Sequence, residues 1–220
     1  MPIANTSRKI PNGLLIVFEG IDGSGKTTHA ANLASRLKDD EFEVVLTKEP
    51  TDGTWGKLLR DSAFSGRKDA GEELELFIKD RQEHVTNKIR PSLAEGKVVI
   101  IDRYYFSTIA YQGARGLDPV EIRSLNEAFA PKPDMLFILE ITVDEALNRI
   151  GIRDGQGNEF ESVENLKSCK SIFDSITDDF TVRINSQTSV PEVDSQIWNK
   201  VSEKLKEVCA LAPLSCDKRS

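Results

Sequence analysis

The stretch GIDGSGKT, from Gly20 to Thr27, has the spacing G-x-x-x-x-G-K-[ST], which is typical of a loop that holds a polyphosphate. Glycines at these positions let the backbone curl until several N–H groups face one anion, and a helix starting at the end of the loop adds partial positive charge. Lys26 is placed to reach the β- and γ-phosphates of a nucleoside triphosphate. The residues expected to contact the triphosphate are Gly20, Ile21, Asp22, Gly23, Ser24, Gly25, Lys26, Thr27 and Thr28.

A second chemical group follows the apolar run in KVVIIDR, where Asp102 ends a predicted buried strand. Open α/β sheets bind their ligands at the carboxyl ends of their strands. There Asp102 would orient Mg²⁺, directly or through a water, while the Thr27 hydroxyl ligates the same ion. A helix cap is the other interpretation of a strand-end aspartate. Beside the glycine loop, we expect Thr27 and Asp102 to form a metal site.

These residues must be positioned by the elements around them, and short apolar runs alternate along the chain with longer segments of helical spacing. Strands are predicted at 14–18, 43–47, 97–101, 135–141 and 180–184, and helices at about 26–38, 54–63, 71–94, 104–130, 143–178 and 190–208. This alternation predicts an α/β protein with a five-stranded, mainly parallel sheet flanked by helices. Together with the glycine loop, it indicates the P-loop NTPase fold. The glycine-rich RDGQGNE, 153–159, interrupts helical sequence and predicts a mobile lid over about 149–161.

Composition narrows the class of protein. The 220 residues suit one domain, expected at 13–208 between a flexible N-terminal extension, 1–12, and a C-terminal tail, 209–220. No apolar run approaches the roughly 18 residues of a membrane span. A net charge of −7 argues against broad binding to duplex nucleic acid, which requires many neutralised phosphates. The three cysteines show neither disulfide nor zinc spacing, which favours a reducing cytoplasm.

The predicted helix at 71–94 carries a charge on its apolar stripe. Arg81 lies on that stripe, and Phe77 precedes it by one turn. A buried guanidinium without a partner is costly, so the arginine either extends outward while Phe77 packs, or the two form a ledge for a ring. In the second case Phe77 stacks on the ring and Arg81 donates to its carbonyl edge. Spacing alone leaves both possibilities open. The stripe consists of Leu74, Ile78, Val85 and Ile89.

Four strings in a fixed order add a family resemblance. FEGIDGSGKTT, EPTDGTWGKLLR, ELFIKDRQEHV and DRYYFSTIAYQG resemble the thymidylate kinases, a branch of the nucleoside monophosphate kinases, and the likeness runs from about residue 14 to 165. The resemblance implies phosphorylation of dTMP to dTDP with ATP and Mg²⁺ in dTTP synthesis, usually by a homodimer. The residues it assigns to the acceptor are Asp22, Glu49, Arg60, Phe77, Arg81, Arg103, Thr108, Tyr111 and Gln112.

Individual roles follow from the same resemblance. Phe77 would stack on thymine and Arg81 would bond its O4 edge, with Thr108 and Gln112 lining that pocket. Arg60 and Arg103 would hold the acceptor's phosphate, as two arginines can do with paired hydrogen bonds.

Asp22 would address the sugar 3′-hydroxyl or its metal. Tyr111 would lie where a 2′-hydroxyl would project, which favours deoxyribose. Glu49 would shape its loop more than touch the substrate.

The family also places a catalytic arginine in either the glycine loop or the lid. Gly23 and Ser24 exclude the loop arrangement, so the lid candidates are Arg149 and Arg153, one helical turn apart. An arginine delivered by lid closure would stabilise the charge on the transferring group, together with Lys26 and Arg103. Solvated surface positions are the other interpretation of the two lid arginines.

Two further functions share parts of this pattern. A deoxynucleoside kinase, or another nucleoside monophosphate kinase, would use the same loop, although an uncharged nucleoside offers no phosphate to Arg60 and Arg103. A GTPase-like switch is the non-enzyme alternative, but NKIR, 87–90, has arginine where the guanine-reading N-K-x-D has aspartate. Of the two histidines, His29 is expected at the surface and His84 on the face of Phe77 and Arg81.

Overall fold

A single parallel sheet forms the centre of the molecule. The computed structural model describes residues 8–66, 68–154 and 163–210, with the backbone alone described at 63–65 and 152–154. The strands lie in the order β2-β3-β1-β4-β5, and each neighbouring pair is parallel. Their bounds are β1 Leu14–Glu19, β2 Val44–Lys48, β3 Val98–Asp102, β4 Met135–Glu140 and β5 Thr181–Asn185. The predicted five-stranded α/β architecture is confirmed.

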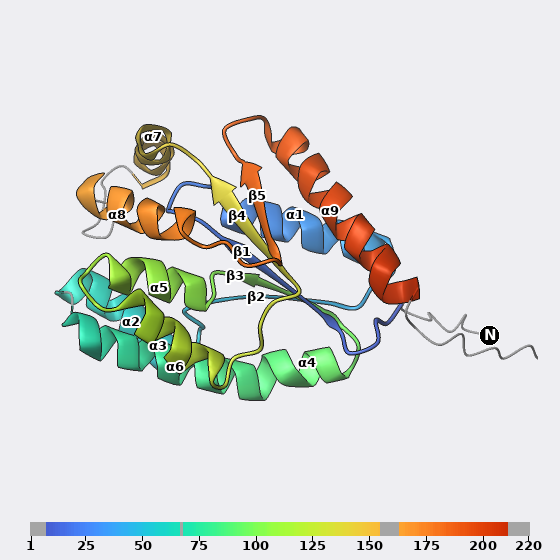
Figure 1. Ribbon diagram of the computed structural model, residues 1–220, viewed down its shortest axis with the longest axis horizontal. Coiled ribbons are helices and arrows are strands. Elements are labelled where there is room, and N and C mark those ends of the chain that lie inside the picture. The colour runs from blue at the N-terminus through green and yellow to red at the C-terminus, as the bar shows by residue number, and fades with distance from the viewer. Residues whose placement is uncertain (1–7, 67, 155–162, 211–220) are drawn as a thin grey trace, which may run out of the picture.

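Helices cover both faces of this sheet (Figure 1). Because side chains alternate along a strand, β1 sends Leu15 and Val17 to one face and Leu14, Ile16 and Phe18 to the other. All six residues of β1 are buried, as the continuous apolar run predicts. Helices α1 and α9 cover the face of Phe18, whereas α3, α5, α6 and α8 lie on the face of Val17. The core therefore has two layers separated by the sheet.

The helices follow the predicted segments with three differences. Their bounds are α1 Lys26–Asp39, α2 Thr54–Ser65, α3 Ala70–His84, α4 Arg90–Ala94, α5 Tyr105–Gly113, α6 Pro119–Glu127, α7 Val143–Asp154, α8 Val163–Asp174 and α9 Val190–Ala210. The predicted helix at 71–94 includes a π-helical turn, Val85–Ile89, which joins α3 to α4.

The other two differences concern helix ends. The predicted helix at 104–130 is two helices, because Asp118 caps α6 by accepting from the Val120 N–H and Pro119 occupies its first position. The predicted segment at 143–178 divides into α7 and α8, and α8 ends at Asp174. Residues 155–161 of the predicted lid, 149–161, lie outside the described residues.

The beginning of the described chain is held against the core. The Arg8 N–H donates to Glu41 O at 2.8 Å, and the Ile10 N–H donates to Gly96 O at 2.8 Å. The Ile10 side chain is buried beside α1 and β3. Two residues of the segment predicted to be a flexible extension, Arg8 and Ile10, thus bond through their backbone to neighbouring loops. Among the described residues, no helix is long and apolar enough to cross a membrane.

Gly56 sets the distance between α2 and the loop after β2. A Cβ atom at Gly56 would lie 1.9 Å from Thr51 O and 2.7 Å from Thr51 N, so α2 can approach this loop only without a side chain. We expect Gly56→Ala to lower the free energy of unfolding by about 1–3 kcal/mol, the usual cost of overpacking. Urea unfolding measures it.

Gly151 provides the matched control, since it is an exposed helical glycine with nothing within 4 Å of its Cβ position. Gly151→Ala should raise the free energy of unfolding by roughly 0.5–1 kcal/mol through helix propensity. Equal effects of the two substitutions would contradict the close approach at Gly56.

Candidate functional site

Two adjoining cavities lie where the strands end. The loop cavity surrounds the glycine loop and reaches Arg149, Ser186 and Val190. The aromatic cavity lies beside the loop after β2, and Phe77 and Tyr104 are among the residues that line it. Asp22 and Arg103 line both cavities, so the predicted phosphate loop and the predicted acceptor pocket are neighbours.

The glycine loop joins β1 to α1 through residues with positive φ, at Gly20, Gly23 and Gly25. Helix α1 begins at Lys26, so its free N–H groups face the loop cavity. Lys26 Nζ donates to Gly20 O and Ile21 O, both at 2.9 Å. Burial lowers the pKa of Lys26 to about 8, helped by Arg103 and opposed by the carboxylates nearby. The charge of Lys26 is therefore lost at a lower pH than that of an ordinary lysine.

Thr27 and Asp102 meet as predicted. The Thr27 hydroxyl donates to Asp102 Oδ2 at 2.5 Å, across 75 residues of sequence. Asp102 Oδ1 is buried and has no hydrogen-bond partner among the described residues. A buried carboxylate oxygen without a donor, next to a hydroxyl and a phosphate-binding loop, fits a hard cation. Within the described ranges, no group of three or more His, Cys, Asp or Glu side chains forms a protein-only metal cage.

Glu19, at the end of β1, was missed in the sequence. Its carboxylate is fully buried and accepts from the Tyr104 N–H at 2.7 Å, the Ser107 N–H at 2.9 Å and the Ser107 hydroxyl at 2.6 Å. Burial raises its pKa to about 7 against these hydrogen bonds. The carboxylate thereby fixes the first turn of α5 directly after Arg103. The signal available in the sequence was a carboxylate directly after the apolar run, at the end of the strand.

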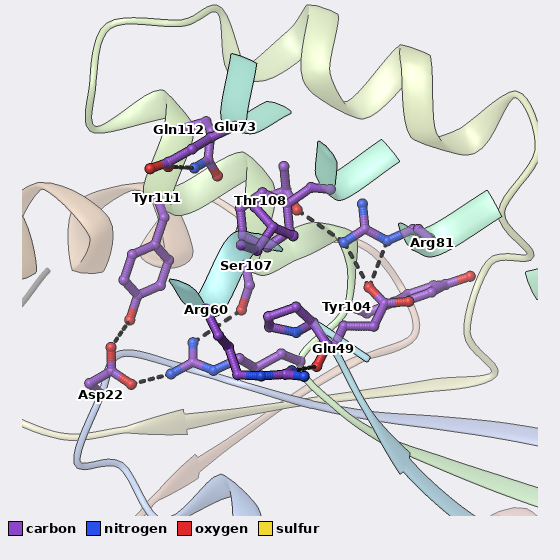
Figure 2. A pocket seen from close by; sticks show the side chains of 14 residues that line it. Asp22, Glu49, Arg60, Glu73, Arg81, Tyr104, Ser107, Thr108, Tyr111 and Gln112 are labelled. Atoms are coloured by element: carbon purple, nitrogen blue, oxygen red, sulfur yellow. Dashed lines mark hydrogen bonds and ion pairs between the residues drawn. The ribbon is translucent and has the colours of Figure 1, made fainter. Parts of the chain in front are cut away.

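Asp22 connects the glycine loop to the strand-end arginine. Arg103 has a φ of 68° and pairs through Nη2 with Asp22 Oδ1. The Tyr111 hydroxyl donates to Asp22 Oδ2 at 2.8 Å (Figure 2). Burial raises the pKa of Tyr111, and the Asp22 carboxylate raises it further, so the phenol keeps its proton. Burial works against the charge of Arg103, but Asp22 outweighs it and the pKa of Arg103 is raised.

Arg60 lines the aromatic cavity together with Arg103. Its Nη1 donates to Pro50 O at 3.0 Å and to Thr51 O at 2.7 Å, while Nη2 lies 3.2 Å from Asp52 Oδ1. The guanidinium therefore ties α2 to the loop after β2. The two arginines expected to hold a phosphate are brought to one cavity, and each already has a protein partner.

Arg81 points into the core and not outward, so the sequence alternative in which it extends to solvent is wrong. It is 1% exposed. Its Nε donates to Glu49 Oε2 at 2.8 Å, Nη2 to Thr108 at 3.0 Å and Nη1 to Asn126 at 2.5 Å (Figure 2 shows the first two partners). Glu49 is thus the countercharge of Arg81 and not only a loop-shaping residue. Asn126, on α6, was missed because its contact spans 45 residues.

Gln112 has a defined orientation. Its Nε2 donates to Glu73 Oε2 at 3.1 Å, and a carboxylate only accepts, so the amide oxygen must be the other atom. That atom, Oε1, is buried without a hydrogen-bond partner in the part of the chain that is described. Phe77 and Thr108 line the same cavity. The structure therefore brings together the four residues predicted to surround a base.

Of the two lid candidates, Arg149 is the one whose side chain is among the described residues. Arg149 lines the loop cavity, where its Nε donates to Glu145 at 2.9 Å and Nη2 donates to Ser186 O at 3.0 Å. Arg153 belongs to the last turn of α7, but its side chain lies outside the described residues. His29, predicted at the surface, is buried and bonds through Nδ1 to Asp194 Oδ1 at 2.6 Å. The packing of α9 on α1 covers it.

Comparison with known proteins agrees with this geometry. The family model for thymidylate kinase matches residues 18–197. The thymidylate kinase of Akkermansia muciniphila is 48% identical over 196 residues, which cover 89% of this chain and 95% of that protein. The thymidylate kinase of Xanthomonas oryzae pv. oryzae is 52% identical over 163 residues, covering 74% of this chain and 71% of that protein. By its sequence along most of its length, this chain belongs to the thymidylate kinase family.

Proposed function

We propose that this chain transfers the γ-phosphoryl group of ATP to dTMP, giving dTDP and ADP, as a step of dTTP synthesis. The observation that carries this proposal is that Arg81 and Gln112 line the same cavity. A guanidinium only donates hydrogen bonds, and the free Gln112 Oε1 only accepts. Thymine presents the matching edge, with a carbonyl oxygen at C4 and an N–H at N3. Cytosine presents an amino group and a lone pair at the same places, so both contacts would fail.

The acceptor's remaining groups have partners in the same cavity. We assign its phosphate to Arg60 and Arg103, which are already aimed at the cavity by the carbonyls and carboxylate that they contact. Asp22 is assigned to the sugar 3′-hydroxyl and Tyr111 to the face where a 2′-hydroxyl would project. Phe77, half-buried in the wall, is assigned to stacking on the base.

The donor is assigned to the loop cavity. Residues Gly20–Thr28 would surround the triphosphate, and Lys26 would exchange its two carbonyl partners for phosphate oxygens. Thr27 and Asp102 would hold Mg²⁺, which when bound neutralises charge on the phosphates. Arg149 closes one wall of this cavity. Arg153, on the last turn of α7, is assigned to the charge that develops during transfer.

The organisation beyond the site is also proposed. We assign residues 13–208 to the catalytic unit, with a lid at about 149–161, and place the protein in the cytoplasm as a homodimer. The support for a dimer is the family, together with apolar side chains left exposed on α2 and α6, such as Leu58 and Leu125, each 43% exposed. Light scattering behind gel filtration measures the mass of the assembly.

A panel of acceptors tests the proposed function directly. With ATP and Mg²⁺, we expect fast ADP release with dTMP, slower release with dUMP and UMP, and almost none with CMP. Absence of dTMP phosphorylation would overturn the proposal, and preference for thymidine over dTMP would indicate a nucleoside kinase.

Base selection is tested by Gln112→Met, which keeps the length of the side chain and removes the amide. The KM for dTMP should rise about 10- to 100-fold, because an unsatisfied buried N–H costs ~1–3 kcal/mol. The preference for dTMP over dCMP, as a ratio of kcat/KM, should fall. Thr181→Val, on β5 away from both cavities, serves as the control. An unchanged preference in Gln112→Met would remove Gln112 from base selection.

Lys26 gives a pH dependence with a definite sign. Its pKa of about 8 means that the free protein loses this charge as pH rises, whereas bound triphosphate favours the protonated lysine. Affinity for a non-hydrolysable ATP analogue should therefore fall above pH 8, by about tenfold per pH unit at the limit. Titration calorimetry from pH 7 to 9.5 measures it. Lys26→Met should bind weakly with a flat profile, and a flat wild-type profile would contradict the assignment.

The lid assignment predicts the effect of Arg153→Ala. We expect kcat to fall by about 10³-fold, within the range for arginines that stabilise phosphoryl transfer, while the KM for dTMP changes little. Steady-state kinetics give both constants. Lys170→Ala, at a half-buried residue of α8 paired with Asp174, is the control. A kcat near the wild-type value would exclude Arg153 from catalysis.

A further inference from the structure

The position of Arg81 depends on Glu49, and Glu49 in turn has a second buried partner. Its Oε2 accepts from Arg81 Nε at 2.8 Å and lies 2.7 Å from Nη2. Its Oε1 lies 2.9 Å from His84 Nδ1, one helical turn after Arg81. The side chains of Arg81, Glu49 and His84 are each no more than 3% exposed. A carboxylate held from both sides cannot rotate without leaving a buried donor unpaired.

The hydrogen-bond partners of His84 fix its tautomer. Glu49 Oε1 only accepts, so Nδ1 carries a proton. The other ring nitrogen, Nε2, lies 2.9 Å from the Thr47 hydroxyl on β2, which can donate to its lone pair. A neutral imidazole thus satisfies both neighbours at once. The resulting chain of contacts runs from Thr47 through His84 and Glu49 to Arg81.

His84 does not line the aromatic cavity. It lines a separate hollow beside β2, together with Thr47, Lys48 and Asn87. Any effect of His84 on a bound base must therefore pass through Glu49. Among the described residues, Glu49 is the ion-pair partner of Arg81 and the one that contacts both its Nε and its Nη2, so it orients the guanidinium together with Thr108 and Asn126.

We propose that His84 is a positioning residue for base selection: by holding Glu49 Oε1, it fixes the guanidinium of Arg81 at the C4 edge of the pyrimidine. This inference rests on the proposed function. Without His84, Glu49 Oε1 is left in the core without a donor, and the carboxylate turns toward other N–H groups. Arg81 then keeps its charge in the cavity but loses the partner of its Nε, so only Thr108 and Asn126 orient the guanidinium.

Three variants test the role of His84. We expect His84→Leu to raise the KM for dTMP by 10-fold or more, to lower kcat by a smaller factor and to reduce the preference for dTMP over dCMP. His84→Asn places an amide N–H where Nδ1 lies and should restore most of that preference. Val85→Ala, a buried change on the next residue, is the control for lost stability and should leave the preference unchanged.

The outcomes separate this inference from the proposed function. Wild-type protein without dTMP turnover overturns the proposed function and the role of His84 with it. Wild-type turnover with an unchanged KM and preference in His84→Leu overturns the role of His84 alone. A preference lost equally in His84→Leu and Val85→Ala assigns the effect to stability and also overturns it.

The tautomer provides a readout that packing alone would not move. Since the chain has two histidines, ¹⁵N labelling of histidine gives two ring pairs, and His84→Asn identifies one of them. We expect His84 to carry a proton on Nδ1, with ring shifts that move when dTMP binds. A ring without a proton on Nδ1, or ¹⁵N shifts that do not change when dTMP binds, would contradict the proposal.

Discussion

The four arginines that line the two cavities, Arg60, Arg81, Arg103 and Arg149, are each held by a carboxylate or carbonyl from a different element. Asp22, in the glycine loop, pairs with Arg103 after β3, and Glu49, after β2, pairs with Arg81 on α3. A guanidinium taken out of water needs such a partner, so the buried charges determine which loops can lie beside which helices. Although the chain has a net charge of −7, several cations lie together at this site, and protein carboxylates and carbonyls already pair with them without substrate.

The pairing has a consequence for phosphoryl transfer. Lys26 alone supplies little positive charge, and its own charge is weakened by burial. Arg103 adds a cation at the boundary of the two cavities, where Asp22 and Tyr111 also lie. On the proposed assignment, a substrate phosphate would exchange places with protein oxygens that already orient these groups, so little reorganisation would be needed on binding. The proposed donor loop and the proposed acceptor cavity meet at the Asp22 carboxylate.

The sequence predicted the sheet and the approximate place of the site because both follow from local patterns. Parallel strands end at one edge, so the glycine loop and Asp102 had to meet there. Partners distant in sequence were beyond such reasoning: the orientation of Gln112 depends on Glu73, 39 residues away, and the burial of His29 on Asp194, 165 residues away. Asp118-Pro119 is a helix-start signal that indicates the break between α5 and α6, but the helical spacing on either side of it favoured one continuous helix. The roles assigned to site residues remain predictions.

The structure of this protein with dTMP bound tests the account most directly. We expect the thymine O4 to lie at Arg81, the N3–H to donate to Gln112 Oε1, and the phosphate to lie between Arg60 and Arg103. Glu49 should still be hydrogen-bonded to His84. A base seated away from Arg81 and Gln112, or a phosphate bound in the glycine loop instead, would contradict it.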